Sequence, residues 1–328
     1  MILNSVSVGP RSGRADAPAI VLTGSIGSTT GMWLPQMDAL SADARVIAVD
    51  HPGRGGSPVP TGDTARYTVA DIATDLLTTL DTLRVASFHL AGLSLGGAVA
   101  QYLAAGRAKS RVLSLTLLCT APKFGEPQSW FDRAAGVRAN GTGSLADGTV
   151  EKWFTAPWRE AHPASTEAYR RMIRGINDEG YALCSEALGR WDFADRLPQI
   201  SAPTLTIAGS TDPSTPPEIL QSVADAVPGP RSWTPAPTSP PSSVLTRSPG
   251  CLPDTSVWRP TDRPSVPHTW FSCPEVVPRS RPRSMGPASR HCFPHPGEDA
   301  VQHSSAPGGR TPGGGVPVYG GVRAVFCV

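Results

Sequence analysis

The chain has 328 residues, 39% of them hydrophobic, which is enough for one large domain with a substantial core or for two small domains. Its formal net charge of +2 is too small to indicate binding to nucleic acid or to an anionic membrane surface. The six cysteines show no C-x-x-C spacing, so we expect neither a disulfide framework nor a metal site.

The beginning of the chain indicates where the protein works. Residues 1–8 alternate like a strand and lack the basic start and long apolar run of a signal peptide. No segment approaches the roughly 20 apolar residues that a membrane helix needs. We therefore expect a soluble, cytoplasmic protein.

Short apolar runs alternate with helical patterns over the first 228 residues. Runs typical of parallel strands covered on both faces lie at 19–22, 45–49, 88–91, 112–118 and 204–208. Residues 69–83 place their apolar side chains on one face of a helix, and residues 96–105 are small and apolar, as in a helix packed tightly on a sheet. This alternation predicts an α/β fold with a mostly parallel, doubly wound sheet.

The alternation stops between Pro122 and Pro198, where Trp, Arg and Glu become more frequent and the pattern indicates helices without strands. An insertion of this kind between two strands would form a cap over the strand ends. The sheet pattern resumes at Thr204. We therefore expect one domain at 1–228 with a helical cap insertion at about 122–198.

The composition changes again near Gly229. More than half of the 35 prolines lie in residues 229–328, a segment that contains no Lys, Ile or Asn and keeps no apolar periodicity. One interpretation is a naturally disordered tail. A second interpretation depends on the catalytic residues described next.

One segment has the pattern of a nucleophile elbow. Gly92-Leu93-Ser94-Leu95-Gly96 matches G-x-S-x-G and lies between a predicted strand and a predicted helix. On such a turn the serine has a strained backbone and an exposed hydroxyl, and glycines flank it because strand and helix approach too closely for side chains. We interpret Ser94 as a nucleophile and the Leu95 N–H as an oxyanion donor; the alternative is a glycine-rich packing turn.

Loops after two other predicted strands carry candidate partners for Ser94. Ser25, in Thr23-Gly24-Ser25-Ile26, would supply the second oxyanion N–H in an α/β-hydrolase, although the usual His-Gly pair is Thr-Gly here. Asp212, in Gly209-Ser210-Thr211-Asp212-Pro213, stands where the acid that orients a catalytic histidine would lie. The alternatives are an ordinary turn and a turn or helix-capping aspartate.

The histidines of the first 228 residues do not complete this set. In α/β-hydrolases the order along the chain is Ser, Asp, His. His51 precedes Ser94, His89 lies inside a predicted strand, and His162 lies in the predicted cap. No histidine follows Asp212 at a suitable distance.

Several segments outside the elbow make the chain resemble the 3-oxoadipate enol-lactonases of the β-ketoadipate pathway. They are residues 24–33, which end at Trp33, the cap motif Trp153-Phe154-Thr155, and residues 191–197 together with 212–217. The resemblance covers roughly residues 1–228. It implies hydrolysis of an enol-lactone to 3-oxoadipate without a cofactor, with the small lactone as the only partner.

The resemblance also implies a mechanism. Ser94 would attack the lactone carbonyl, and an activated water would hydrolyse the acyl-enzyme. The substrate carries a free carboxylate, and Trp130 and Arg133 are spaced to share one face of a cap helix. Arg133 could bind that carboxylate with two parallel hydrogen bonds, or it could be an ordinary surface arginine.

Members of this family carry the triad histidine about 25 residues after the acid, in a segment like Leu-Asp-x-x-x-His-Leu-Ala. At that place this chain reads Arg231 to Pro240 without a histidine. Read one base earlier, the Trp233-Thr234 codons give Asp, and the codons from Ser232 to Pro240 are compatible with Leu-Asp-Pro-Gly-Pro-His-Leu-Ala. We therefore predict a frameshift near Gly229, which would have removed the triad histidine, the last strand and the last helix.

Two other functions remain open at this point. One is another small carboxylesterase, or a cofactor-free, haloperoxidase-like hydrolase, which would differ in substrate preference. The other is a non-catalytic α/β-hydrolase relative that acts as a binding protein, against which the retention of Ser94 and Asp212 argues.

Overall fold

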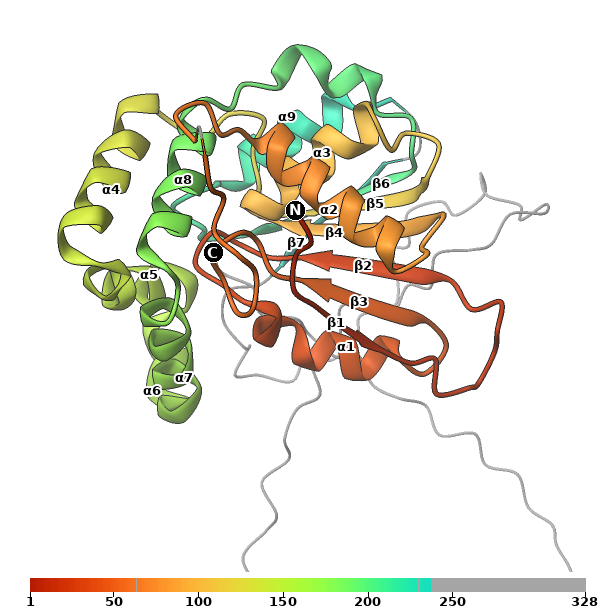
Figure 1. Ribbon diagram of the computed structural model, residues 1–328, viewed down its shortest axis with the longest axis horizontal. Helices are drawn as coiled ribbons and strands as arrows, with labels where there is room; N and C mark the ends of the chain where they lie inside the picture. Colours follow the sequence, from red (N-terminus) through yellow and green to blue (C-terminus); the bar gives the residue numbers. More distant parts are fainter. Residues whose placement is uncertain (63, 229–230, 237–328) are drawn as a thin grey trace, which may run out of the picture. The chain divides into compact units, whose positions relative to one another are not determined.

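The computed structural model describes residues 1–62, 64–228 and, as backbone, 231–236. Its seven strands are β1 (Ser5–Val8), β2 (Ala19–Thr23), β3 (Arg45–Val49), β4 (Phe88–Leu93), β5 (Val112–Leu118), β6 (Thr204–Gly209) and β7 (Arg231–Ala236). They form one sheet in the order β1-β3-β2-β4-β5-β6-β7 (Figure 1). Strand β1 is antiparallel to β3, and all other neighbours are parallel.

The strand order places the candidate site. From β2, the chain adds β3 on one side and then crosses back to add β4 on the other side. The loops that leave the carboxyl ends of β2 and β4 therefore diverge, and this opens a crevice where α/β sheets bind their ligands. The Ser25 loop follows β2, and Ser94 follows β4, so adjacent strands bring the two predicted features together.

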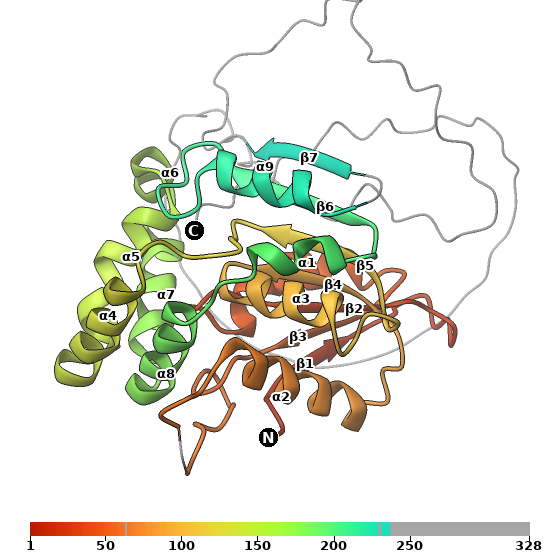
Figure 2. The same cartoon turned by 90° about the horizontal axis from the view of Figure 1, so that it is seen from above.

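Helices cover both faces of the sheet, as a doubly wound fold requires (Figures 1 and 2). Helices α2 (Val69–Thr82) and α3 (Leu95–Ala105) share one apolar core with α9 (Pro217–Ala226). On the other face, η1 (Thr30–Trp33) and α1 (Leu34–Leu40) bury Trp33 and Met37 against β2 and β3. The sequence pattern did not predict α1, whose buried residues are Gln36 and Met37 while Leu34 is exposed, so its apolar residues do not mark its buried face.

Residues between β5 and β6 form helices and no strand. They are α4 (Pro127–Asn140), η2 (Thr142–Leu145), α5 (Ala146–Trp153), α6 (Ala156–Ala161), α7 (Pro163–Arg174), α8 (Asp178–Gly189) and η3 (Ala194–Gln199). Helices α4 to α8 lie beyond one end of the sheet (Figure 1), and α4 packs along α8. The short helix η3 instead packs against α3, with the Arg196 guanidinium 5.5 Å from the Tyr102 ring. The last part of the predicted cap segment therefore lies on the sheet layer.

Strand β7 corrects one expectation. We expected the last strand to be lost after Gly229, but Arg231–Ala236 pairs in parallel with all six residues of β6. The ladder is made of main-chain N–H and C=O groups, so a composition that lacks an apolar pattern does not prevent pairing. The predicted loss of the last helix and the rest of the 229–328 tail lie outside the described residues.

No helix in the described part of the chain is both long enough and apolar enough to cross a bilayer.

Candidate active site

Ser94 stands at a sharp turn between β4 and α3. Its backbone angles are φ 55° and ψ −114°, a strained conformation for a residue with a side chain. Two hydrogen bonds made by the backbone of Ser94 hold the turn: the Ser94 N–H donates to Leu118 O at 3.0 Å, and Thr120 Oγ1 donates to Ser94 O at 2.8 Å. The Ser94 hydroxyl bonds to no group among the described residues and faces the pocket described below.

Gly92 and Gly96 are required by close backbone contacts. A Cβ atom at Gly92 would lie 2.3 Å from the carbonyl oxygen of Gly96. A Cβ atom at Gly96 would lie 2.3 Å from the carbonyl oxygen of Thr23. Both distances are far below van der Waals contact, and the opposing atoms are backbone, so the strand–turn–helix geometry tolerates only glycine here.

The Ser25 loop lies directly beside this turn. The Gly96 N–H donates to Gly24 O at 3.0 Å and joins the two loops. The N–H of Leu95 is in the first turn of α3, where helical N–H groups have no intrahelical acceptor. Neither this N–H nor that of Ser25 donates to an acceptor in the described part of the chain. Two free N–H groups near a serine hydroxyl have the chemistry of an oxyanion hole.

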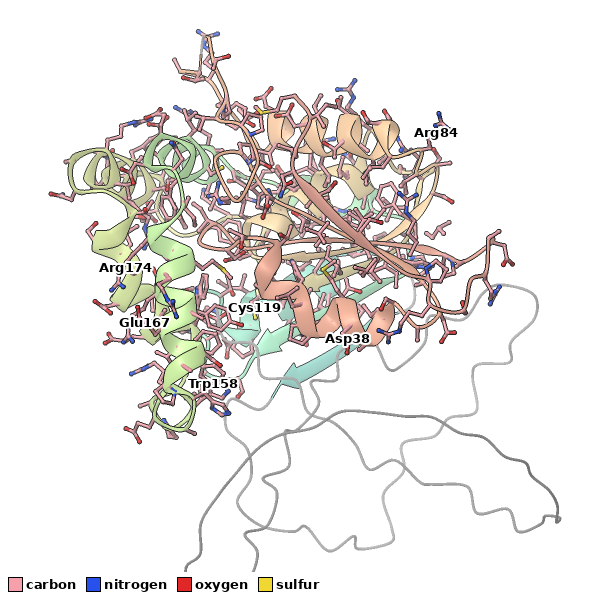
Figure 3. All side chains as sticks on the ribbon, turned by 60° about the horizontal axis from the view of Figure 1, so that its bottom comes forward. Asp38, Arg84, Cys119, Trp158, Glu167 and Arg174 are labelled. Carbon is pink, nitrogen blue, oxygen red and sulfur yellow. The ribbon has the colours of Figure 1, made fainter. Side chains whose placement is uncertain are left out.

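Asp212 is buried after β6, and its carboxylate is well supported. Oδ1 accepts from the N–H groups of Ser214 at 2.8 Å and Thr215 at 3.1 Å, and Oδ2 accepts from Thr215 Oγ1 at 2.7 Å. Burial nevertheless raises the pKa of Asp212, while these bonds and the Cys119 thiol act to lower it. Cys119 lies where the sheet meets the cap helices (Figure 3).

No histidine in residues 1–62 and 64–228 bonds to Asp212 or to Ser94. His51 Nε2 lies 2.9 Å from Gly24 O, and His89 Nδ1 lies 2.8 Å from Ser114 Oγ. His162 Nδ1 lies 2.9 Å from Trp158 O, on the cap (Figure 3). The predicted triad position and the later histidines lie outside the described residues.

A pocket of about 290 Å³ lies between the core loops and the cap. Its walls include four of the predicted site residues: Ser25, Ser94, Trp130 and Arg133. Asp212 is not part of the wall, but the next three residues, 213–215, are. The sequence analysis missed Lys152 and Tyr181, which also line the pocket. These two residues reach the pocket through the packing of the cap helices, which the sequence pattern does not encode. The one available signal was that Lys152 directly precedes the Trp153-Phe154-Thr155 motif.

Arg133 is held in place without a carboxylate partner among the described residues. Its guanidinium carbon lies 5.0 Å from the centre of the Trp130 ring, and Nη1 donates to the Tyr181 hydroxyl at 3.3 Å. Trp130 is itself fixed, because its Nε1–H donates to Phe124 O at 2.6 Å. The pocket wall described here has two cationic side chains, Arg133 and Lys152, and no acidic one, which favours an anionic ligand.

The chemistry of the site can now be stated. It combines a serine on a strained turn, two N–H donors, a buried acid and a cationic pocket, which together suit acyl transfer to serine. The described residues include no cluster of three or more His, Cys, Asp or Glu side chains that could hold a metal ion.

The fold and this site define the class of protein. The family model described as the alpha/beta hydrolase fold matches residues 18–238. The chain therefore belongs to the α/β-hydrolase family, as its G-x-S-x-G turn predicts.

Within this family the chain is related to 3-oxoadipate enol-lactonases. It is 35% identical over 203 residues to 3-oxoadipate enol-lactonase 2 of Acinetobacter baylyi, and these residues make up 62% of this chain and 74% of that protein. The enol-lactonase structure from Burkholderia xenovorans is 35% identical, covers 71% of this chain and 87% of that one, and superposes with a TM-score of 0.67. A putative carbamate hydrolase RutD of Stutzerimonas stutzeri is 31% identical over 226 residues, 65% of this chain and 81% of that protein.

Proposed function

We propose that this chain derives from an enzyme that hydrolyses 3-oxoadipate enol-lactone through an acyl-enzyme at Ser94. The observation that carries the proposal is the pocket, which is lined by Ser94 from the core and by the half-buried Arg133 from the cap and has no acidic side chain among its described residues. A lactone with a free carboxylate suits both features, since it offers an ester carbonyl to the serine and an anion to the guanidinium. The named enol-lactonases at 35% identity support this choice of substrate.

The reaction would proceed in two steps. Ser94 Oγ attacks the lactone carbonyl, and the N–H groups of Ser25 and Leu95 stabilise the negative charge that forms on its oxygen. The ring C–O bond then breaks, and the enol oxygen takes up the proton that the serine lost. Water hydrolyses the acyl-enzyme, which gives a second carboxylate, and the released enol becomes the ketone of 3-oxoadipate.

Both steps need a base that accepts a proton and then passes it on, and Asp212 by itself does not act as such a base. In the family's arrangement the acid orients a histidine, which accepts the serine proton. We propose that a frameshift near Gly229 removed this histidine, so the chain as it stands is a poor enzyme. Comparable triads without one member retain roughly 10³–10⁴-fold catalysis over water, far below the intact level.

The experiment compares two proteins. One is the present chain, and the other has its reading frame shifted back after Gly229. We expect enol-lactone hydrolysis to be strong only in the second protein, where Ser94→Ala should abolish it. Equal activity in the two proteins would overturn the frameshift proposal, and absence of enol-lactone hydrolysis in the second would overturn the substrate proposal.

A carboxylesterase for neutral esters is the second candidate. A thermophilic esterase from Thermogutta terrifontis is 28% identical and superposes with a TM-score of 0.65. Its distinguishing property would be a preference for simple aryl esters over the carboxylate-bearing lactone, measured as kcat/KM in the frame-restored protein. A non-catalytic relative would instead leave Ser94 unlabelled by a fluorophosphonate probe.

A further inference from the structure

One loop, residues 50–57, contains two buried side chains that hold the carbonyl groups on either side of Ser25. His51 is 3% exposed, and its Nε2 lies 2.9 Å from Gly24 O and 3.1 Å from Thr23 Oγ1. Arg54 is fully buried, and its Nε and Nη2 donate to Ile26 O at 2.9 and 2.6 Å. Neither side chain lines the pocket, so both act from behind the Ser25 loop.

Peptide geometry connects His51 to the oxyanion donor. In a trans peptide the C=O of Gly24 and the N–H of Ser25 belong to one plane and point in opposite directions. The Gly24 oxygen points at two donors, His51 Nε2–H and the Gly96 N–H at 3.0 Å. The Ser25 N–H therefore points away from His51, and Ser25 itself lines the pocket.

The protonation of His51 suits this role. Burial and the nearby Arg54 charge lower its pKa to about 3, so the ring is neutral near pH 7 and has one N–H. Because Nε2 lies beside a carbonyl oxygen, which only accepts, the proton belongs on Nε2. A neutral ring adds no positive charge behind the loop, and its one N–H is used to hold the peptide.

Arg54 extends the same support into the cap. Its Nη1 donates to Pro52 O at 2.6 Å and lies 3.3 Å from Cys184 Sγ of α8. The guanidinium carbon also lies 5.8 Å from the centre of the Tyr181 ring. The oxyanion loop and the cap helix that lines the pocket are thus fixed to one buried cation.

We propose that His51 and Arg54 are positioning residues that preorganise the Ser25 N–H as an oxyanion donor. This inference rests on the proposed acyl transfer at Ser94 but not on the choice of lactone. Preorganised donors are effective because they do not have to reorient as charge develops on the substrate oxygen. His51 would therefore affect the transition state more than substrate binding.

The test uses the full 328-residue chain with His51→Phe, which cannot donate, and His51→Gln, which can. The first readout is hydrolysis of p-nitrophenyl acetate, whose good leaving group reduces the need for a base and whose neutrality avoids Arg133. Loss of a whole oxyanion donor costs about 10²–10³-fold in kcat. Since the Gly96 N–H still holds Gly24 O in His51→Phe, we expect a loss of about tenfold, with KM nearly unchanged and most activity retained in His51→Gln. Equal kcat values in the wild-type chain and both variants would overturn the proposal.

The second readout does not depend on activity. Crystal structures of the wild-type chain and of His51→Phe should differ in the orientation of the Gly24–Ser25 peptide, while His51→Gln should keep the wild-type orientation. An unchanged peptide in His51→Phe would overturn the proposal. If His51→Phe fails to fold, Arg54→Lys, which keeps the charge but loses the paired donors to Ile26 O, replaces it in both readouts. If Ser94→Ala leaves ester hydrolysis unchanged, the proposed function fails, and the crystal structures still decide the role of His51.

Discussion

Replacing Arg133 tests whether the cap recognises the substrate carboxylate. The change is Arg133→Met in the frame-restored protein, which keeps most of the side-chain length and removes the guanidinium. Arg133 is half-buried, stacked near Trp130 at 5.0 Å and bonded to Tyr181 at 3.3 Å, so binding a carboxylate would cost little additional ordering. These contacts occupy only part of its five N–H donors.

The size of the effect follows from this geometry. A charge-assisted pair of hydrogen bonds is worth on the order of 1.5–3 kcal/mol net, which corresponds to about 10- to 150-fold in kcat/KM. The carboxylate is remote from the reacting carbonyl, so its contact is the same in the ground state and the transition state. The loss should therefore appear mainly in KM.

The assay compares the lactone acid with its neutral methyl ester in both proteins. The neutral ester should change by less than about threefold in kcat/KM, because it lacks the charge that Arg133 would bind. Arg138→Met is the matched control, since Arg138 lies on the same helix but pairs with Glu179 and Glu186 outside the pocket. An equal rise in KM for the acid and the ester would refute the reasoning and make Arg133 a structural residue.

Four further predictions concern the turn, the loop behind it and the buried acid. Ser94→Ala in the frame-restored protein should lower lactone hydrolysis by roughly 10³-fold or more, and near-normal turnover would contradict the elbow assignment. Gly96→Ala should lower the free energy of unfolding in urea by about 1–3 kcal/mol, because its Cβ would meet a backbone carbonyl oxygen at 2.3 Å. Its control is Gly136→Ala in α4, where the added Cβ would meet no atom within 4 Å beyond the adjacent helix backbone and where added helix propensity should stabilise by about 0.5–1 kcal/mol. The free energy of unfolding of the wild type should fall as the pH drops from about 6.5 toward about 3, because His51 takes up a proton in the unfolded state but stays neutral in the folded state. His51→Gln should lose less stability over this range, and equal losses in the two proteins would disprove the burial argument. Burial raises the pKa of Asp212 in the folded state, so the wild type loses stability as the pH rises and this carboxyl group ionises. Asp212→Asn has no such ionisation, so its free energy of unfolding relative to the wild type should increase between pH 3.5 and pH 7. A difference between the two proteins that is independent of pH would be the contrary result.

The periodicity of the sequence determined the α/β sheet and the turn at Ser94. Buried parallel strands need continuous apolar runs, and the five predicted runs are all strands, with β2, β4 and β6 extending one or two residues further. The elbow was equally readable, because the close approach of β4 and α3 admits only glycine at 92, and the carbonyl at the end of β2 admits only glycine at 96. These features are local, so a single segment contains their physical cause.

Codon reasoning and composition gave a less complete account of the chain after Gly229. They led us to expect no strand there, yet β7 pairs with β6 through main-chain groups. A composition signal reports on side-chain burial, whereas a strand at this side of the sheet needs only backbone donors and acceptors. The absence of a histidine bonded to Asp212 within the described residues leaves the frameshift proposal to the experiment above.

Only the tertiary structure decided what surrounds Ser94. The sequence named Ser25, Trp130 and Arg133, but their meeting in one pocket depends on the strand order and on the packing of the cap over the sheet end. The sequence set His51 aside as a histidine in the wrong place for a triad. In the fold its Nε2 reaches Gly24 O, 27 residues earlier in the chain, because β2 and β3 are neighbours and their loops leave from the same edge. Contacts of this kind join residues distant in sequence, and no local pattern encodes them.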